Sequence, residues 1–162
     1  MIHVPSVRLL TLLVFLAAPV AGCGASLIAN TDVEDSSENR RVLAFCERYR
    51  HAVEAGDVDT LVSMVSPRYF ETGGNAKATD DLDYNGLRAY LANYFMRTKS
   101  IRYEIRYHRV NETENKIIQI DYTYTASYQI PTTKGDLWHR SVRDNRLQLL
   151  RDGDTFKILS GM

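Results

Sequence analysis

Tyrosine is the residue type in this sequence best suited to shaping a small-molecule site. All 10 tyrosines lie between residues 49 and 128. Each combines an apolar ring with a hydroxyl group that needs a hydrogen-bond partner when it is buried. Two interpretations stay open: a cavity with polar handles, or a core whose hydroxyl groups reach its rim. The tyrosines on faces expected to be buried are Tyr49, Tyr84, Tyr94, Tyr103, Tyr107, Tyr122, Tyr124 and Tyr128.

The other side chains that could do chemistry are scattered along the chain. His51, His108 and His139 lie on three different predicted elements without the spacing of metal ligands, so no metal site and no cofactor are expected. The sequence has no glycine-rich phosphate loop, no serine-centred nucleophile elbow and no zinc-protease helix motif. Strand parity places His139 on the same side as Leu147 and Leu149, and this predicts that it faces the interior.

Length and composition limit the class of protein. With 162 residues, one domain of ordinary size is expected. Lysine plus arginine and aspartate plus glutamate are both 20, so the basic excess of a nucleic-acid binder is missing and no nucleic-acid partner is expected. Hydrophobic residues make up 44% and charged residues 25%, which is typical of a globular domain rather than of a disordered chain.

Residues 1–22 have the pattern of a secretory signal. Arg8 precedes an apolar run, Leu9–Val20, which as a helix would span about 18 Å, short of the roughly 30 Å of a bilayer core. The motif Val20-Ala21-Gly22-Cys23 resembles the lipobox of bacterial lipoproteins, which implies cleavage before Cys23 and acylation of its thiol. The alternative is ordinary signal cleavage followed by a free cysteine.

The lipobox resemblance also implies a location. It implies a domain in the bacterial cell envelope that is held to a membrane by the acyl chains on Cys23, since two or more chains give stable anchoring. Gly24 is not the aspartate that marks retention in the inner membrane of some bacteria, which favours the outer membrane. Residues 23–37 are predicted to be the lipidated cysteine and a flexible tether, whose 14 residues after the cysteine reach at most about 48 Å.

Hydrophobic spacing predicts three helices within a folded domain that covers residues 38–162. A capping pattern at 35–38 precedes an apolar helical face from Val42 to Val53, which includes Cys46 as a buried, inert thiol. A second helix begins at Val58 and is limited by Pro67. After a short strand over 68–72, a third helix carries its apolar residues between positions 84 and 95.

After Arg97 the hydrophobic period changes to two. Alternation predicts antiparallel strands over 101–108, 118–128, 137–150 and 155–160, each with one face toward water. Asp121 and His108 fall on polar faces, and this favours a solvated outer surface over a catalytic His–Asp pair. Helices followed by a run of strands imply an α+β domain with its helices on one face of the sheet.

Two segments carry a resemblance to a known superfamily. The stretch from Glu47 to Met64 and the terminal pattern over 152–160 resemble the nuclear transport factor 2-like superfamily, which includes SnoaL-like polyketide cyclases, ketosteroid isomerases and scytalone dehydratase. The resemblance covers residues 38–162. It implies a cone-shaped, curved antiparallel sheet with the three N-terminal helices packed on its concave face. Because this fold hosts unrelated activities, the resemblance implies a pocket rather than a particular reaction.

A comparison with the ketosteroid isomerases implies that this chain keeps the hydrogen-bond donors of their active site but lacks the catalytic base. Tyr49 matches the family's tyrosine and Asn145 the position of its second oxyanion donor, whereas Gly73 stands at the position of the catalytic aspartate. Glycine cannot accept a proton, and Glu71 on the same strand face is the carboxylate that could replace it. The candidate pocket residues are Tyr49, Glu71, Tyr103, Tyr122, Tyr124, His139 and Asn145, and no catalytic residue is assigned.

Three functions follow as expectations. The first is a lipid-anchored envelope domain without enzymatic activity that binds a small, partly apolar ligand in the cone. The second is a protein-interaction or assembly module that pairs, for example as a homodimer, through the outer sheet face with its row of Arg102, Glu104 and Arg106. The third is an isomerase or dehydratase that uses Tyr49 and Asn145. Binding and interaction rank above catalysis because the base is missing.

Overall fold

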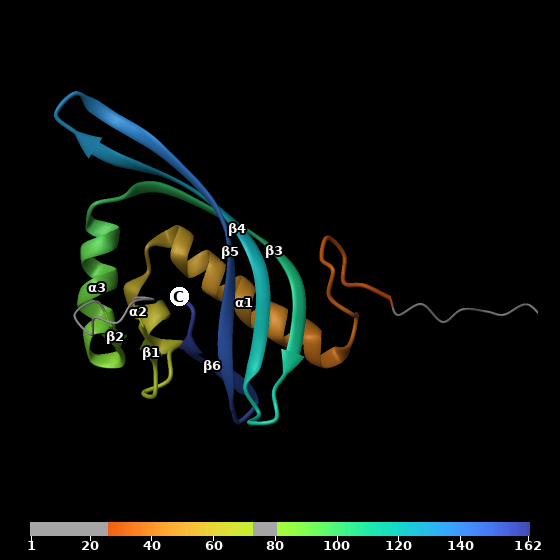
Figure 1. Ribbon diagram of the computed structural model, residues 1–162. Coiled ribbons are helices and arrows are strands. Elements are labelled where there is room, and N and C mark those ends of the chain that lie inside the picture. Colours follow the sequence, from red (N-terminus) through yellow and green to blue (C-terminus); the bar gives the residue numbers. More distant parts are fainter. Residues whose placement is uncertain (1–25, 73–80) are drawn as a thin grey trace, which may run out of the picture.

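The protein is an α+β domain in which helices precede a curved antiparallel sheet. The computed structural model describes residues 26–72 and 81–162 (Figure 1). This arrangement confirms the fold class expected from the sequence. The helices are α1 (Ser37–Ala55), α2 (Val58–Ser63) and α3 (Tyr84–Met96), and the strands are β1 (Phe70–Glu71), β2 (Leu82–Asp83), β3 (Lys99–Glu112), β4 (Ile118–Thr132), β5 (Gly135–Asp152) and β6 (Thr155–Ser160).

Helix α1 begins and ends at the residues that the sequence predicts. The Ser36 side chain accepts a hydrogen bond from the Asn39 backbone N–H at 3.1 Å, which satisfies one of the free donors of the first turn. Gly56 ends the helix with a φ of 62°, a left-handed conformation that glycine adopts without steric cost. Asp57 then caps α2 by accepting from the Thr60 backbone N–H at 3.0 Å. The two helices are therefore joined by a turn with little freedom.

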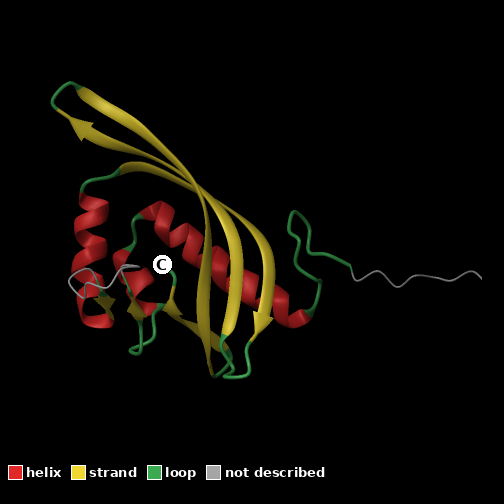
Figure 2. Ribbon diagram, in the orientation of Figure 1, coloured by secondary structure: helices red, strands yellow, loops and turns green. Residues whose placement is uncertain are grey.

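The four long strands form one antiparallel sheet in the order β3-β4-β5-β6. Figure 2 shows these strands curving around the helices, with α3 and the short hairpin of β1 and β2 standing beside the sheet. A bulge between Tyr107 and Arg109 shifts the register of β3 against β4, and such bulges increase the local twist of a strand. The curvature leaves a concave side that faces the helices.

The strand faces that are buried in the core are those predicted from the alternation of apolar and polar residues. Tyr103 and Tyr107 from β3, and Tyr122 from β4, are buried together with Leu147 and Leu149 from β5. Helix α1 packs on the same core through Val42, Phe45, Cys46 and Tyr49. Cys46 is 1% exposed, and burial raises the pKa of its thiol, which confirms the predicted buried thiol.

The segment before α1 differs from the flexible tether that the sequence suggested. Residues 26–36 fold back on the domain: the Asp32 backbone N–H donates to the Tyr107 carbonyl at 3.0 Å, and Val33 is 2% exposed. The Asp32 carboxylate also lies 2.9 Å from Nδ1 of His108 and 3.0 Å from a guanidinium nitrogen of Arg106. The prediction of a free tether is therefore wrong for residues 26–36, while Cys23 lies outside the described residues.

The attachment of this segment should weaken in acid. Hydrogen bonds from His108 and then Arg106 lower the pKa of Asp32 below its ordinary value of 3.8. The attachment is stabilised by this shift above pH 3.8, and the stabilisation is lost as the pH falls through the lower pKa of the folded state. We expect the Val33 methyl resonances in NMR spectra to move toward unfolded positions in that range, and Asp32→Asn to produce the same change at pH 7. If the Val33 resonances stay in place both in acid and in Asp32→Asn, this role for Asp32 is contradicted.

The hairpin of β4 and β5 projects beyond the helices (Figure 1). Residues 131–140 are all exposed, and this stretch includes Leu137 and Trp138 at 56% and 54% exposure. The sequence pattern did not predict this projection, because alternation gives the face of a residue and not its distance from the core.

Among the helices that the structure describes, none is long and apolar enough to cross a membrane.

Candidate functional site

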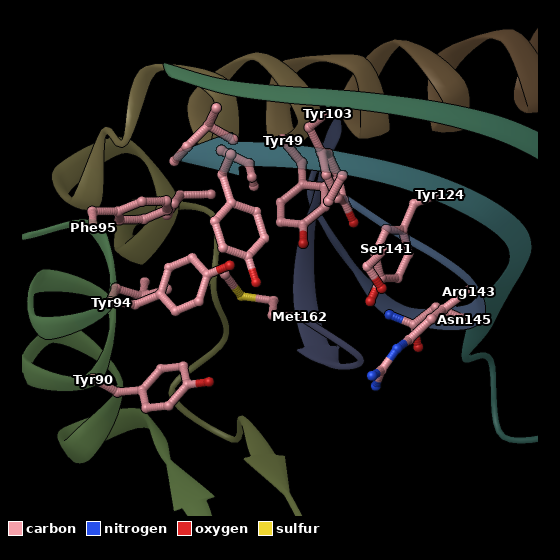
Figure 3. Close-up of a pocket in the computed structure, with 16 residues that line it drawn as sticks. Tyr49, Tyr90, Tyr94, Phe95, Tyr103, Tyr124, Ser141, Arg143, Asn145 and Met162 are labelled. Carbon is pink, nitrogen blue, oxygen red and sulfur yellow. The ribbon is translucent and has the colours of Figure 1, made fainter. Parts of the chain in front are cut away.

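A cavity of about 400 Å³ lies between the concave side of the sheet and helix α3 (Figure 3). This volume is within the range of small-molecule sites. Its wall is formed by two groups of side chains, one from the helices and one from the strands and the last residue. They are Tyr49, Val53, Leu61, Tyr90, Leu91, Tyr94 and Phe95, and Ile101, Tyr103, Tyr124, Ala126, Tyr128, Ser141, Arg143, Asn145 and Met162.

Strand parity directs the sheet residues into the cavity. In β4, Tyr124, Ala126 and Tyr128 alternate with outward-facing residues, and β5 pairs with them in register through Arg143↔Tyr124 and Ser141↔Ala126. The cavity therefore extends along the part of the sheet where side chains of both strands point to the same side.

Helix α3 closes the cavity on the other side. Four side chains of this helix line the cavity, in two pairs that are each about one turn apart: Tyr90 with Tyr94, and Leu91 with Phe95. Asp83 begins the helix by accepting a hydrogen bond from the Gly86 backbone N–H at 2.8 Å. In Figure 3 the rings of Tyr90 and Tyr94 extend from α3 toward Met162 and the sheet.

Aromatic rings form a continuous wall inside the cavity. The rings of Tyr49 and Tyr103 have centroids 6.3 Å apart, those of Tyr103 and Tyr124 are 5.3 Å apart, and those of Tyr94 and Tyr128 are 6.4 Å apart. Burial is the main cause that raises the pKa of Tyr49 and of Tyr103. Both phenols are neutral near pH 7, as an unperturbed tyrosine would be, and the shift keeps them neutral at higher pH as well, so they can offer hydrogen bonds without adding a negative charge.

Asn145 lines the cavity, but its amide group is already in use. Its Nδ2 donates to the hydroxyl oxygen of Tyr122 and to the carbonyl of Gly161, at 3.0 Å in both cases. Its Oδ1 accepts from the backbone N–H of Arg146 at 2.8 Å. An amide nitrogen carries two hydrogens, and both are directed to protein oxygens. Asn145 therefore holds the C-terminal segment against β5 and is not poised to stabilise a bound oxyanion.

Three residues that the sequence placed in the pocket lie elsewhere. Tyr122 is 2% exposed and lies beneath the cavity wall, where it accepts the hydrogen bond from Asn145. Glu71 accepts a hydrogen bond from the Gly161 backbone N–H and does not line the cavity. His139 is exposed on the projecting hairpin and stacks on the ring of Tyr128 with centroids 5.8 Å apart. Of the candidate set, Tyr49, Tyr103, Tyr124 and Asn145 line the cavity.

Several lining residues were not among the candidates. Tyr90 and Phe95 come from α3, whose predicted apolar spacing could have indicated Phe95 but not the more exposed Tyr90. Ser141 and Arg143 share the parity of Leu147 on β5, a signal that was present in the sequence. No pattern in the sequence indicated that Met162 would fold back to the cavity.

The outer face of the sheet carries the polar network that the sequence predicted there. Asp121 is bound by Arg146 and Arg109, whose hydrogen bonds lower the pKa of this carboxyl group. His108 contacts Asp32 through Nδ1 and the Thr123 hydroxyl through Nε2, at 2.9 and 2.8 Å. Within residues 26–72 and 81–162, no group of His, Cys, Asp and Glu side chains could hold a metal ion.

Comparisons with known proteins support the fold and leave the activity open. No family model matches the chain, and no curated protein matches its sequence. Solved structures do match; they include proteins at 10–16% identity, and these matches cover 77–79% of this chain.

Three of these structures illustrate the likeness. A putative dehydratase from the NTF2-like family of Streptomyces avermitilis has 15% identity and a TM-score of 0.61, with 94% of that chain covered. A ketosteroid isomerase-like protein from Erwinia carotovora atroseptica has 13% identity and a TM-score of 0.61, with 95% covered. A Catenulispora acidiphila protein in complex with S-DNPA has 15% identity and a TM-score of 0.56, with 92% covered. The chain therefore has the nuclear transport factor 2-like fold expected from its sequence.

Proposed function

We propose that this protein binds a small, partly apolar ligand in the cavity between the sheet and α3, and does so without catalysis. The observation that carries the proposal is the lining itself: about 400 Å³ of space walled by aromatic rings, with neutral phenols and a few polar groups directed inward. Such a surface releases water when an apolar ring enters and can orient that ring by hydrogen bonds. One solved structure of the same fold holds a ligand, S-DNPA.

The proposal includes a location in the bacterial cell envelope. The lipobox-like motif ending at Cys23 supports acylation of that cysteine and anchoring to a membrane, with the outer membrane favoured. Because residues 26–36 are attached to the domain, two residues after Cys23, Gly24 and Ala25, remain as a spacer, which reaches at most about 7 Å. The binding domain would thus be held close to the lipid surface. Loss of membrane association in Cys23→Ser is the expected result, and unchanged association would contradict the anchor.

Blocking the cavity should weaken the binding of an apolar probe. Ser141 lines the cavity on β5, whereas its neighbour Val142 lies on the opposite face and is 56% exposed. We expect Ser141→Trp to place an indole in the cavity and to weaken the binding of the neutral dye N-phenyl-1-naphthylamine at least tenfold, about 1.4 kcal/mol. The control Val142→Trp adds the same side chain outside the cavity and should leave the affinity unchanged. Dye fluorescence in a titration measures both.

Two results would contradict the binding proposal. One is a wild-type protein that does not bind the dye, because a cavity open to ligands with this lining should accept an apolar two-ring compound. The other is equal weakening by Ser141→Trp and Val142→Trp, because the dye would then occupy a surface outside the cavity. Thermal unfolding of both variants shows that each is folded before the titration.

The geometry gives catalysis less support. Asn145 has no free amide hydrogen, Glu71 is bound to the Gly161 backbone, and the described lining residues include no Asp, Glu or His. An isomerase or dehydratase needs a group that accepts a proton from the substrate. Among the described residues, the cavity wall includes no carboxylate or imidazole side chain that could accept this proton near pH 7. We therefore do not propose for this chain the dehydratase or isomerase activity that the names of the similar proteins suggest.

A second candidate function uses the outer face of the sheet. Trp138 and Val142 are exposed there at 54% and 56%, and the guanidinium carbon of Arg102 lies 5.7 Å from the Trp138 ring centroid. Exposed large apolar side chains on one sheet face favour pairing with another protein surface. We propose self-association through this face as that candidate. A homodimer that persists on dilution is its expected result, and a strict monomer at high concentration would contradict it.

A further inference from the structure

We propose that the ligand of the cavity carries an anionic group, which Arg143 binds at the mouth while the apolar part of the ligand lies among the tyrosine rings. This inference rests on the proposed binding function and narrows it to a chemical class: compact, largely aromatic acids such as carboxylates or sulfonates.

The first argument is the charge of the cavity wall. Arg143 is the only charged side chain among the described lining residues. The phenols of Tyr49 and Tyr103 are neutral at pH 7, as tyrosines ordinarily are, and burial raises their pKa further, so they do not offset the guanidinium charge. Asp144, the next residue along β5, belongs to the outer face, where it accepts a hydrogen bond from the Thr123 hydroxyl. An anion in the cavity would therefore meet one positively charged side chain and no acidic side chain of the described wall.

The second argument is that Arg143 has no partner within the described part of the chain. Arg146, three residues further along β5, is bound by Asp121 at 2.6 Å, and Arg50 on α1 is bound by Glu47 and Glu54 at 2.7 and 2.8 Å. By contrast, Arg143 makes no ion pair and no cation–π contact with residues 26–72 or 81–162. Its donors are available for a ligand, and a guanidinium group suits the planar or tetrahedral oxygens of an acid.

The third argument is the distribution of polarity along the cavity. Figure 3 places Ser141, Arg143 and Asn145 together at one end, apart from Phe95 and Tyr94. The helix side of the wall has no charged side chain, and it combines tyrosine rings with the aliphatic side chains of Val53, Leu61 and Leu91. A ligand that matches this wall has an apolar body and a polar or charged group at one end.

Two dyes with a common aromatic skeleton test the charge preference. N-Phenyl-1-naphthylamine is neutral, and 8-anilino-1-naphthalenesulfonate has the same two-ring and phenyl skeleton with one sulfonate added. Because Arg143 is exposed, we expect its contribution to the affinity for the sulfonate to be modest. Arg143→Gln should weaken the binding of the sulfonate about fivefold and change the affinity for the neutral dye less than twofold. Salt should weaken the binding of the sulfonate to the wild type and leave the neutral dye unaffected.

Arg140 provides the matched control. It lies on the same strand, is exposed, has no ion pair with the described residues, and does not line the cavity. Arg140→Gln removes the same net charge, so it should leave the affinity for both dyes unchanged if the effect is local to the cavity mouth.

The outcomes separate this inference from the binding proposal. Binding of the neutral dye together with a sulfonate affinity that Arg143→Gln does not change would overturn the anion preference alone. Equal losses in Arg143→Gln and Arg140→Gln would also overturn it, because they would indicate a general effect of net charge. Failure of both dyes to bind the wild type would overturn the binding proposal and this inference with it.

Discussion

Leu149→Ala is expected to lower the free energy of unfolding by about 3 kcal/mol. Leu149 has no exposed surface, and it pairs across the sheet with Ile118 of β4 and Ile158 of β6, which are buried as well. Removing the isobutyl group loses its transfer free energy and leaves a void between two strands that cannot close freely. Because a domain of this size is typically stable by about 5–15 kcal/mol, the loss is a large fraction of the total. Urea unfolding at pH 7 measures it.

The same strand offers a control for this prediction. Leu137 has the same side chain and the same parity on β5, but it lies on the projecting hairpin and is 56% exposed. We expect Leu137→Ala to change the free energy of unfolding by less than about 0.5 kcal/mol. Similar losses in the two variants would mean that the projecting hairpin is packed against a surface, and would contradict the arrangement described for β4 and β5.

Gly161→Ala is expected to release the C-terminal residues from the sheet and to cost about 2 kcal/mol. Gly161 has a φ of 93°, and a Cβ atom there would lie 2.0 Å from the Arg146 carbonyl oxygen. The backbone must therefore move, which breaks the hydrogen bond from Gly161 to Glu71 and the one from Asn145 to Gly161. Met162 would leave the cavity wall, so the affinity for N-phenyl-1-naphthylamine should fall as well.

Gly153→Ala is a control that separates the effect of the Cβ clash at Gly161 from the effect of a left-handed backbone conformation. Gly153 has a φ of 57°, also left-handed, but nothing lies within 4 Å of the position that a Cβ would take. We expect this variant to lose about 1 kcal/mol of stability from the strained backbone and to bind the dye normally. If Gly161→Ala cost no more than Gly153→Ala and left dye binding intact, the C-terminal segment would not form part of the cavity.

The sequence predicted which side of each strand is buried, because parity along a strand is a local property. The buried faces of β3 and β4, with Tyr103, Tyr107 and Tyr122, were expected from alternation alone. Helix α1 was likewise expected between its capping residues and Gly56. Local patterns of this kind depend on residues that are close in the chain.

The errors in the candidate site have a common physical cause. Parity does not give depth, so it could not distinguish Tyr122, which lies beneath the cavity, from Tyr124 on its wall, or show that His139 lies beyond the core. It also could not show that Glu71 and Asn145 bind the backbone of Gly161, because that contact joins distant parts of the chain. The attachment of residues 26–36 to β3 escaped prediction for the same reason.

The central claim is that the cavity holds a small ligand in the native protein. Native mass spectrometry of the protein isolated from cells tests it most directly, because it reports bound mass and oligomeric state together. We predict a monomer with one reproducible added mass that disappears in Ser141→Trp and is retained in Val142→Trp. A bare protein, or an added mass that Ser141→Trp retains, would contradict the claim, and a bare homodimer would favour the outer sheet face as the functional surface.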